Sequence, residues 1–345
     1  MCKRPPEADG AIDSLTTPLV YFLAVKKWAL IVIRTGVSVA LLGVLARRIQ
    51  WEQARGIIAS LRGDLFLLAV VLYLVGQLLS SYRWRILLAP LGLAVAYLRL
   101  VGFYFLGMFF NFFLPTVIGG DAVKVYYLAG ETGSATTSAA SVFMDRNTGL
   151  LALLLLATIT AAAGDVRVSD VPLVYPLLGG LLVYGAANVI LFRETTYRWM
   201  ERQSRRIGAQ TLTRIIARWS EACRAYRQSP RVIAAAVGIS LLFDLLLIGA
   251  TSITARALGI AVPLTYFLVF VPIISVLSMV PVTLYGLGVR EYGFLVFFSS
   301  VGVPAEACVL LSLVWLLVTV VASVPGALIY AGYRRRRSGR LEPEG

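Results

Sequence analysis

The chain has 345 residues; 59% are apolar or aromatic and only 14% are charged, against about 25% charged residues in a typical soluble protein. The mean hydropathy is +0.81. The apolar residues form blocks that are too long for a soluble core to bury. These figures exclude a soluble globular enzyme, a disordered chain and a disulfide scaffold. They leave an all-α polytopic membrane protein.

The charge balance is strongly basic, with 32 Lys and Arg against 18 Asp and Glu. In a membrane protein, basic loops report orientation and contact with anionic lipid. We therefore expect membrane lipids as partners, and no nucleic acid. The chain has no histidine, which excludes histidine-based acid–base catalysis and histidine metal ligands. Cys2, Cys223 and Cys308 are isolated and have no zinc-site spacing. No cofactor or metal is expected.

Long apolar stretches alternate with short polar ones along the chain. A transmembrane helix needs about 20 mostly apolar residues, and about eight stretches come near that length. Residues 1–27 are predicted to form a cytoplasmic tail, 28–333 the integral membrane domain and 334–345 a basic cytoplasmic tail. The predicted helices cover residues 28–46, 65–82, 141–163, 173–192, 232–255, 264–280, 289–302 and 308–333.

Two stretches carry helix-breaking residues inside apolar sequence. Residues 98–128 are interrupted by Pro115 and a glycine pair, and we expect two half-helices that enter and leave the membrane on one side. Residues 264–302 follow the same plan around Pro281. The sequence leaves open whether this second stretch spans twice or re-enters. Two broken elements of one plan suggest an inverted repeat and a transport site.

Basic residues predict the orientation. The loop 193–231 carries ten Lys and Arg against three acidic residues. Placing this loop and both termini in the cytoplasm satisfies the positive-inside tendency, although the basic loop 47–64 then falls outside. Within 193–231, apolar residues at helical spacing predict one short amphipathic helix. It would lie on an anionic leaflet or pack on the helical bundle.

The first cluster that could carry chemistry surrounds the break in 98–128. Proline removes a backbone donor, and paired glycines loosen the helix. Exposed backbone N–H groups at such a break attract anions such as phosphate. An acidic and a basic residue three positions apart share one helix face. The alternative is a structural kink with an interfacial salt bridge. The cluster comprises Asn111, Pro115, Gly119, Gly120, Asp121 and Lys124.

Other charged residues fall inside or beside apolar stretches, where they are costly and commonly mark substrate pathways. Asp244 lies in the middle of a span and could instead pair with an arginine for packing. Asp145 and Arg146 begin a span, and Arg83 and Arg85 close another. Arg83 and Arg85 could grip a lipid phosphate or anchor their helix at the interface. Asp145 and Arg146 could likewise belong to the functional site or be an interfacial anchor. The second broken element adds Pro281, Gly286, Gly288, Arg290 and Glu291.

Four of these motifs occur in the order of a known family: Arg83-Trp84; Asn111, Leu114, Pro115, Gly119, Gly120, Asp121 and Lys124; Asp145, Arg146 and Gly149; and Pro281, Gly286, Gly288, Arg290 and Glu291. In this order the chain resembles the lysylphosphatidylglycerol synthase transmembrane, or flippase-like, family from about residue 28 to 333. Lys124 stands where the family often has arginine.

The resemblance implies a multi-pass protein of a bacterial or archaeal inner membrane that moves a lipid between leaflets. Family members are linked to phospholipids, aminoacyl-lipids, hopanoids and polyprenyl-linked lipids. In the multiple peptide resistance factor group, the flippase-like region precedes a soluble aminoacyltransferase domain, which does not follow residue 333 here. We therefore expect a stand-alone member that is a transporter and not an enzyme.

The leading hypothesis is a lipid translocator. Arg83, Lys124, Arg146 and Arg290 would receive phosphate, while acidic residues would balance them or accept a cationic headgroup or a coupling proton. One alternative is a non-catalytic membrane subunit that assembles with envelope-lipid biosynthetic enzymes. The other is a membrane-embedded lipid-modifying enzyme, whose acid–base groups would be Asp121, Asp145 and Glu291.

Overall fold

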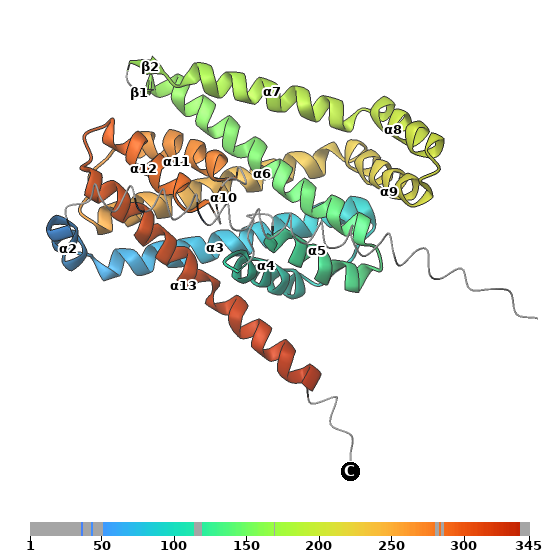
Figure 1. The fold of residues 1–345 in the computed structure, drawn as a ribbon, viewed down its shortest axis with the longest axis horizontal. Helices are drawn as coiled ribbons and strands as arrows, with labels where there is room; N and C mark the ends of the chain where they lie inside the picture. The colour runs from blue at the N-terminus through green and yellow to red at the C-terminus, as the bar shows by residue number, and fades with distance from the viewer. Residues whose placement is uncertain are drawn as a thin grey trace, which may run out of the picture.

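The computed structural model describes residues 36, 43, 51–113, 119–168, 170–279, 283 and 286–338. Most of the first expected span, 28–46, lies outside these residues, as do Pro115 and Pro281. The described part confirms an all-α membrane protein (Figure 1). Five helices are long and apolar enough to cross a membrane: α3 (Gly63–Leu88, continued by η1, Ala89–Leu91), α6 (Ala135–Gly164), α7 (Val174–Phe192), α10 (Pro230–Ala257) and α13 (Ala305–Ser338).

Local sequence explains where several elements begin and end. The side chain of Ser134 accepts a hydrogen bond from the Thr137 N–H and caps α6. Pro230 occupies the first turn of α10, where a missing N–H is tolerated. A short antiparallel ribbon joins α6 to α7. It consists of β1 (Arg167–Val168) and β2 (Val171–Pro172). A further helix, α2 (Trp51–Ala59), precedes α3.

The first broken element is an antiparallel hairpin of α4 (Tyr97–Asn111) and α5 (Gly119–Thr132). Arg99 and Glu131 pair at 2.6 Å at its open end. At its closed end the Gly120 N–H donates to Asn111 Oδ1 at 2.7 Å. Fifteen helical residues extend about 22 Å, less than the roughly 30 Å of a bilayer core. Each helix of the hairpin is therefore too short to cross a bilayer core alone, which agrees with the half-helices expected from the sequence.

The second broken element is also a hairpin, formed by α11 (Leu264–Met279) and α12 (Val289–Ser299). The rings of Phe267 and Phe298 lie 4.9 Å apart near its open end, and Gly286 lies against Ser278 near its tip. Helices of 16 and 11 residues are too short to span separately. In the described residues, the stretch that the sequence left open is thus an antiparallel pair of short helices, which favours re-entry over two separate spans.

The two hairpins enter from opposite ends of the bundle. The open end of α4–α5 lies near the start of α6, where Arg218 contacts Ser134. The open end of α11–α12 lies at the other end of α6, where Thr265 packs against Gly164. Figure 1 shows the two hairpins on either side of the molecule's centre. This arrangement fits the inverted repeat suggested by the sequence.

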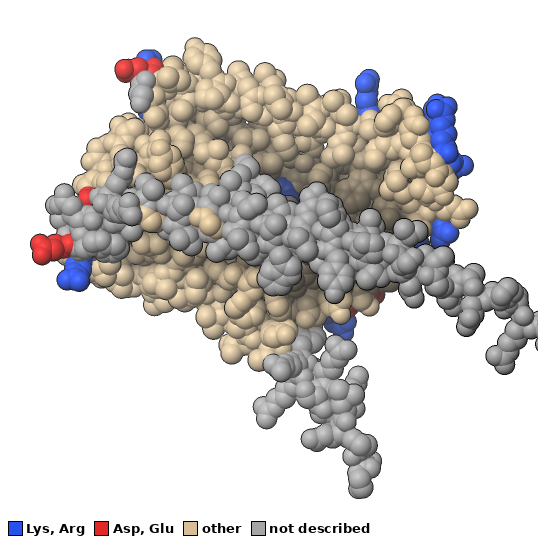
Figure 2. All heavy atoms as spheres, viewed as in Figure 1, with Lys and Arg blue, Asp and Glu red and all other residues tan. Residues whose placement is uncertain are grey.

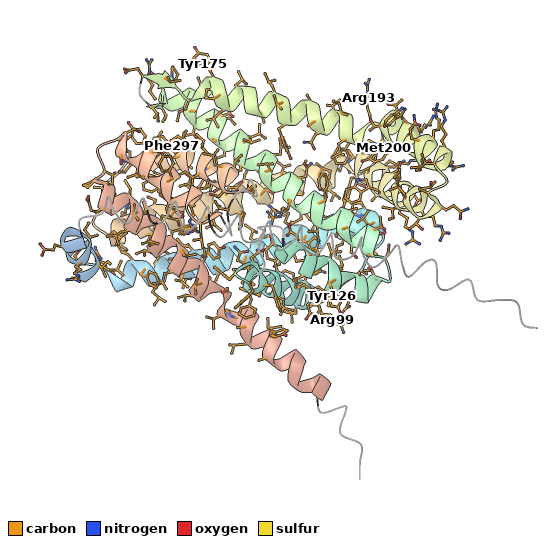
Figure 3. All side chains as sticks on the ribbon, in the orientation of Figure 1. Arg99, Tyr126, Tyr175, Arg193, Met200 and Phe297 are labelled. Carbon is orange, nitrogen blue, oxygen red and sulfur yellow. The ribbon has the colours of Figure 1, made fainter. Side chains whose placement is uncertain are left out.

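The basic loop 193–231 contains two helices rather than the one expected: α8 (Glu194–Arg206) and α9 (Gln210–Arg227). They pack together through Tyr197, Ile216 and Cys223. Figure 2 shows basic side chains projecting from this end, and Figure 3 places Arg193 and Met200 there. The sequence did not predict α8 because nearly all of its residues are polar, so apolar spacing was a weak signal.

Cys223 provides a test of this α8–α9 packing. Its thiol is buried and lies 3.2 Å from the Tyr197 hydroxyl, and burial raises the pKa of the Cys223 thiol. Since the thiolate is the reactive form, little of it forms at pH 7. In a Cys2→Ser background, we expect maleimide to label Cys223 at least tenfold more slowly than a cysteine placed by Gln228→Cys, roughly as thiolate fraction and access dictate. Equal rates would contradict the packing.

Candidate functional site

A cavity of about 300 Å³ lies in the centre of the bundle, beside the closed end of the α4–α5 hairpin. Helices α3, α6, α10 and α11 complete its walls. Three basic and three acidic residues line it, all contributed by predicted membrane helices or by the first hairpin. The charged lining residues are Arg83, Asp121, Lys124, Asp145, Arg146 and Asp244.

The best-buried pair in this cluster joins α3 to α6. Arg83 is 4% exposed and Asp145 is 2% exposed, and Arg83 Nε donates to Asp145 Oδ1 at 2.8 Å. Arg83 Nη1 also donates to Ser240 Oγ on α10 at 2.8 Å. A Cβ at Gly149 would lie 3.1 Å from Arg83 Nη1, so the glycine makes room for the guanidinium. One arginine thus ties three helices together.

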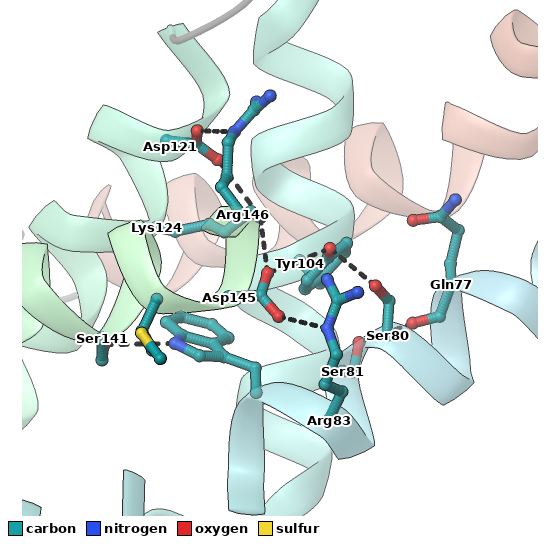
Figure 4. A network of polar contacts seen from close by, with 12 residues as sticks. Gln77, Ser80, Ser81, Arg83, Tyr104, Asp121, Lys124, Ser141, Asp145 and Arg146 are labelled. Carbon is teal, nitrogen blue, oxygen red and sulfur yellow. Dashed lines mark hydrogen bonds and ion pairs between the residues drawn. The ribbon is translucent and has the colours of Figure 1, made fainter. Parts of the chain in front are cut away.

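Lys124 bridges the hairpin to this pair (Figure 4). Its Nζ lies 3.3 Å from Asp121 and 3.9 Å from Asp145. It also lies 3.8 Å from the centre of the Tyr104 ring, a cation–π geometry that favours a desolvated ammonium. The Tyr104 hydroxyl is in turn hydrogen-bonded to Ser80 at 2.9 Å. The buried lysine is therefore held as a cation.

Arg146 completes the ion-pair network and is its most accessible member. Its guanidinium pairs with Asp121, and its side chain remains 33% exposed. Arg83 and Lys124, by contrast, are almost fully enclosed. A ligand that enters the cavity can therefore reach Arg146 without first breaking the buried contacts of the other two cations.

Close backbone contact at the hairpin tip positions Asp121 and Lys124. A Cβ on Gly120 would lie 2.2 Å from the Gly107 carbonyl oxygen and 2.6 Å from Asn111 Oδ1, so only glycine fits. The Gly120 N–H is bonded to Asn111. The sequence predicted backbone N–H groups open to an anion at this break, and for Gly120 that is wrong. Side-chain cations, not this amide, supply the positive charge.

Asp244 lies on α10 and lines the same cavity. It is 4% exposed, and its Oδ2 atom is fully buried without a hydrogen-bond partner among the described residues. A buried polar atom without a partner costs about 1–3 kcal/mol, and more when it is charged. The other two lining carboxylates are ion-paired. Asp244 is therefore the least satisfied acidic group of the cavity.

A second cavity, of about 210 Å³, lies between the two hairpins. Asn111, Ser275 and Met279 line both cavities, so the two spaces adjoin. Arg290 lines the second cavity, and its Nη2 atom pairs with Glu291 Oε1 at 2.6 Å. The two broken elements thus meet in the middle of the bundle.

The positions predicted from the sequence fall into three groups. The six charged residues named above line the first cavity together with Asn111. Gly120 lies beside Asn111 at the closed end of the hairpin. At the second break, Arg290 lines the adjoining cavity and pairs with Glu291, which is fully buried. Gly286 and Gly288 lie in the turn before α12, and the Glu291 carboxylate accepts a hydrogen bond from the Gly288 N–H. Arg85 is exposed and lies outside both cavities. Gly119 is buried at the start of α5; Pro115 and Pro281 lie outside the described residues.

Several lining residues were not predicted. Gln77 and Ser240 are isolated polar residues in long apolar helices, and that isolation was an available signal. Tyr104 could not be distinguished from an interfacial aromatic residue, because its role depends on Lys124 from another helix. Tyr73 and Ser275 carried no signal of their own. All five contribute to the cavity or to the contacts of its cations.

Residues 31–326 match the family described as the lysylphosphatidylglycerol synthase TM region. The chain belongs to this family. The matched range includes both hairpins and every described charged residue of the two cavities, so the site lies wholly within the lysylphosphatidylglycerol synthase TM region. Membership supports a multi-pass membrane protein and a role connected with membrane lipid.

One curated relative is the UPF0104 membrane protein PH1989 of Pyrococcus horikoshii, which is 32% identical over 126 residues. The match covers 35% of this chain and 36% of that protein, so the chain matches about a third of the length of this relative. No solved structure matches the chain.

Proposed function

We propose that this member of the lysylphosphatidylglycerol synthase TM family translocates a phosphate-bearing lipid between the leaflets of a bacterial or archaeal cytoplasmic membrane. The observation that supports this most is the convergence of three cations on a cavity beside the closed end of the first hairpin, which adjoins the cavity lined by the second hairpin. Intramembrane ionisable residues that face a cavity are typical of substrate pathways. Broken helices that meet near the middle of the membrane are typical of transporter sites.

The volume of the central cavity suits a lipid headgroup without its acyl or prenyl chains. A volume of about 300 Å³ is at the lower end of the range for small-ligand sites, roughly 300–1,000 Å³. Acyl or prenyl chains would remain in the bilayer, where their burial is already favourable. Arg83, Lys124 and Arg146 would bind the phosphate by charge-assisted hydrogen bonds. Arg290 in the adjoining cavity would receive it next.

The distribution of basic residues supports an orientation. Helices α8 and α9 and the start of α4 lie at one end of the bundle, which carries the larger number of arginines. By the positive-inside tendency this end faces the cytoplasm. We propose that both termini lie on the same side. In this orientation the α4–α5 hairpin enters from the cytoplasm. We propose a transporter rather than an enzyme.

Lipid scrambling in proteoliposomes tests the function. Wild-type protein in vesicles that contain fluorescently labelled phosphatidylglycerol should expose inner-leaflet lipid to a membrane-impermeant quencher faster than empty vesicles do. Arg146→Gln removes the accessible cation and should lower this rate at least tenfold, since a charge-assisted contact contributes about 1.5–3 kcal/mol.

Arg85→Gln is the matched control. It removes the same charge from an exposed position outside both cavities, and its rate should equal that of the wild type. An equal loss in both variants would mean that surface charge, not the cavity, drives movement. No acceleration by the wild-type protein with any phosphate-bearing lipid would overturn the proposed function.

A further inference from the structure

The central cavity combines a cationic network with one acidic group that the network leaves unsatisfied. Arg83, Lys124 and Arg146 supply three positive charges, while Asp121 and Asp145 supply two negative charges in direct ion pairs with them. The remaining lining acid, Asp244, makes no ion pair in the described part of the chain. The charges of the described lining residues therefore sum to zero when Asp244 is ionised, and to +1 when Asp244 is protonated.

The surroundings of Asp244 leave its carboxyl group without a paired cation in the described part of the chain. The helices packed against α10 present the following titratable side chains to the cavity: Tyr73 and Arg83 from α3, Asp145 and Arg146 from α6, and, through the hairpin, Tyr104, Asp121 and Lys124. Helix α11 presents Ser275 and Met279, which do not titrate. One of these cations, Arg83, already donates to Asp145 and Ser240. An ionised Asp244 would keep Oδ2 buried without a donor from the described residues.

We infer that the cavity binds one singly charged phosphate diester together with one proton, and that Asp244 carries the proton. A neutral cluster has little attraction for an anion, whereas a cluster of charge +1 matches the single negative charge of a diester. Anion and proton then bind with positive coupling, and each raises the affinity for the other. This inference rests on the proposed headgroup site and adds the charge class of its ligand.

The sign of the pH dependence follows from this coupling. The proton that accompanies the diester becomes scarcer as pH rises. The affinity should therefore fall with rising pH, by up to about tenfold per pH unit once Asp244 is ionised in the empty protein. At lower pH, where Asp244 is already protonated, the affinity should no longer change. A site that used only fixed cations would show no such slope between pH 6 and 9.

Calorimetry can count the proton directly. Detergent-solubilised full-length protein is titrated with dihexanoyl-phosphatidylglycerol at pH 8 in buffers of different ionisation enthalpy. The titration is repeated at higher pH, and uptake by wild type should rise toward one proton per lipid bound as Asp244 becomes ionised in the empty protein. Asp244→Asn should bind the same lipid with an uptake near zero and with an affinity that does not vary with pH. Asp64→Asn removes an exposed carboxylate outside the cavity, and its proton uptake should equal that of wild type.

The outcomes separate this inference from the proposed function. Lipid binding without proton uptake by wild type, or unchanged uptake in Asp244→Asn, would overturn the inference and leave the headgroup site standing. No binding of any diester at any pH would overturn both. Glycerophosphoglycerol carries the same diester without chains and should bind more weakly with the same uptake. Tighter binding of inorganic phosphate than of either diester would also overturn the inference. If Asp244→Asn fails to fold, the wild-type pH slope remains decisive.

Discussion

Asp145→Asn is expected to lower the free energy of unfolding by about 3–5 kcal/mol, the usual cost of removing one partner from a buried ion pair. The substitution keeps the shape of the side chain but removes the charge that faces Arg83 at 2.8 Å and Lys124 at 3.9 Å. Lys124 would then keep its ion pair with Asp121, while Arg83 would keep its hydrogen bond to Ser240 but lose its paired carboxylate. The measurement is thermal unfolding of the purified protein in detergent, followed by fluorescence.

The same variant should lose lipid scrambling, because repulsion between the two cations would displace Lys124 from the cavity wall. Asp64→Asn is the control, since Asp64 pairs with Arg62 on the surface, where both side chains are more than half exposed. Surface pairs contribute little, so its unfolding midpoint should match that of wild type. A midpoint for Asp145→Asn within error of wild type would show that the Arg83–Asp145 pair does not support the fold.

Gly120→Ala should separate the two helices of the first hairpin. The added methyl group would lie 2.2 Å from a backbone oxygen of Gly107, which cannot move as a flexible side chain could. Forcing an extra carbon into a packed contact typically costs about 1–3 kcal/mol. Because Asp121 and Lys124 follow in the next turn, we expect scrambling to fall as well as stability.

Gly130→Ala is the matched variant on the same helix. A Cβ there meets nothing within 4 Å, and alanine is favoured over glycine in a helix by about 1 kcal/mol. The protein should therefore become slightly more stable and keep its scrambling rate. Equal destabilisation by the two substitutions would mean that the loss in Gly120→Ala reflects helix propensity or general intolerance of α5, not contact with Gly107.

The helices and their breaks were predictable because the membrane imposes a simple length rule. Long apolar stretches gave α3, α6, α7, α10 and α13, and prolines and glycines marked the first hairpin. The second hairpin stayed undecided, since 264–302 contains enough apolar residues for either two short spans or a re-entrant pair. The contact of Phe267 with Phe298 in an antiparallel pair and the short lengths of α11 and α12 favour the re-entrant pair.

The sequence predicted which residues belong to the candidate site. It did not predict which acidic residue pairs with which basic residue. Charge inside apolar sequence identified Asp121, Lys124, Asp145 and Asp244. Which acid pairs with which base depends on helix rotation and on contacts between distant segments. Asp145 shows the difference: its sequence position suited an interfacial anchor, yet α6 begins at Ala135 and carries it into the core. Arg85 points away from the cavity, because residues two positions apart on a helix, such as Arg83 and Arg85, do not share a face.

The uneven burial of the helices has a consequence for how the protein is made. Helix α7 has Leu177 as its one buried residue and is apolar along its length, so we expect it to partition into the bilayer without help from the rest of the bundle. The short hairpin helices are not expected to partition in this way, because a broken backbone at membrane depth needs protein or a water-filled cavity around it. We therefore expect insertion of the long helices to precede docking of the α4–α5 and α11–α12 hairpins, and the charged centre to assemble last.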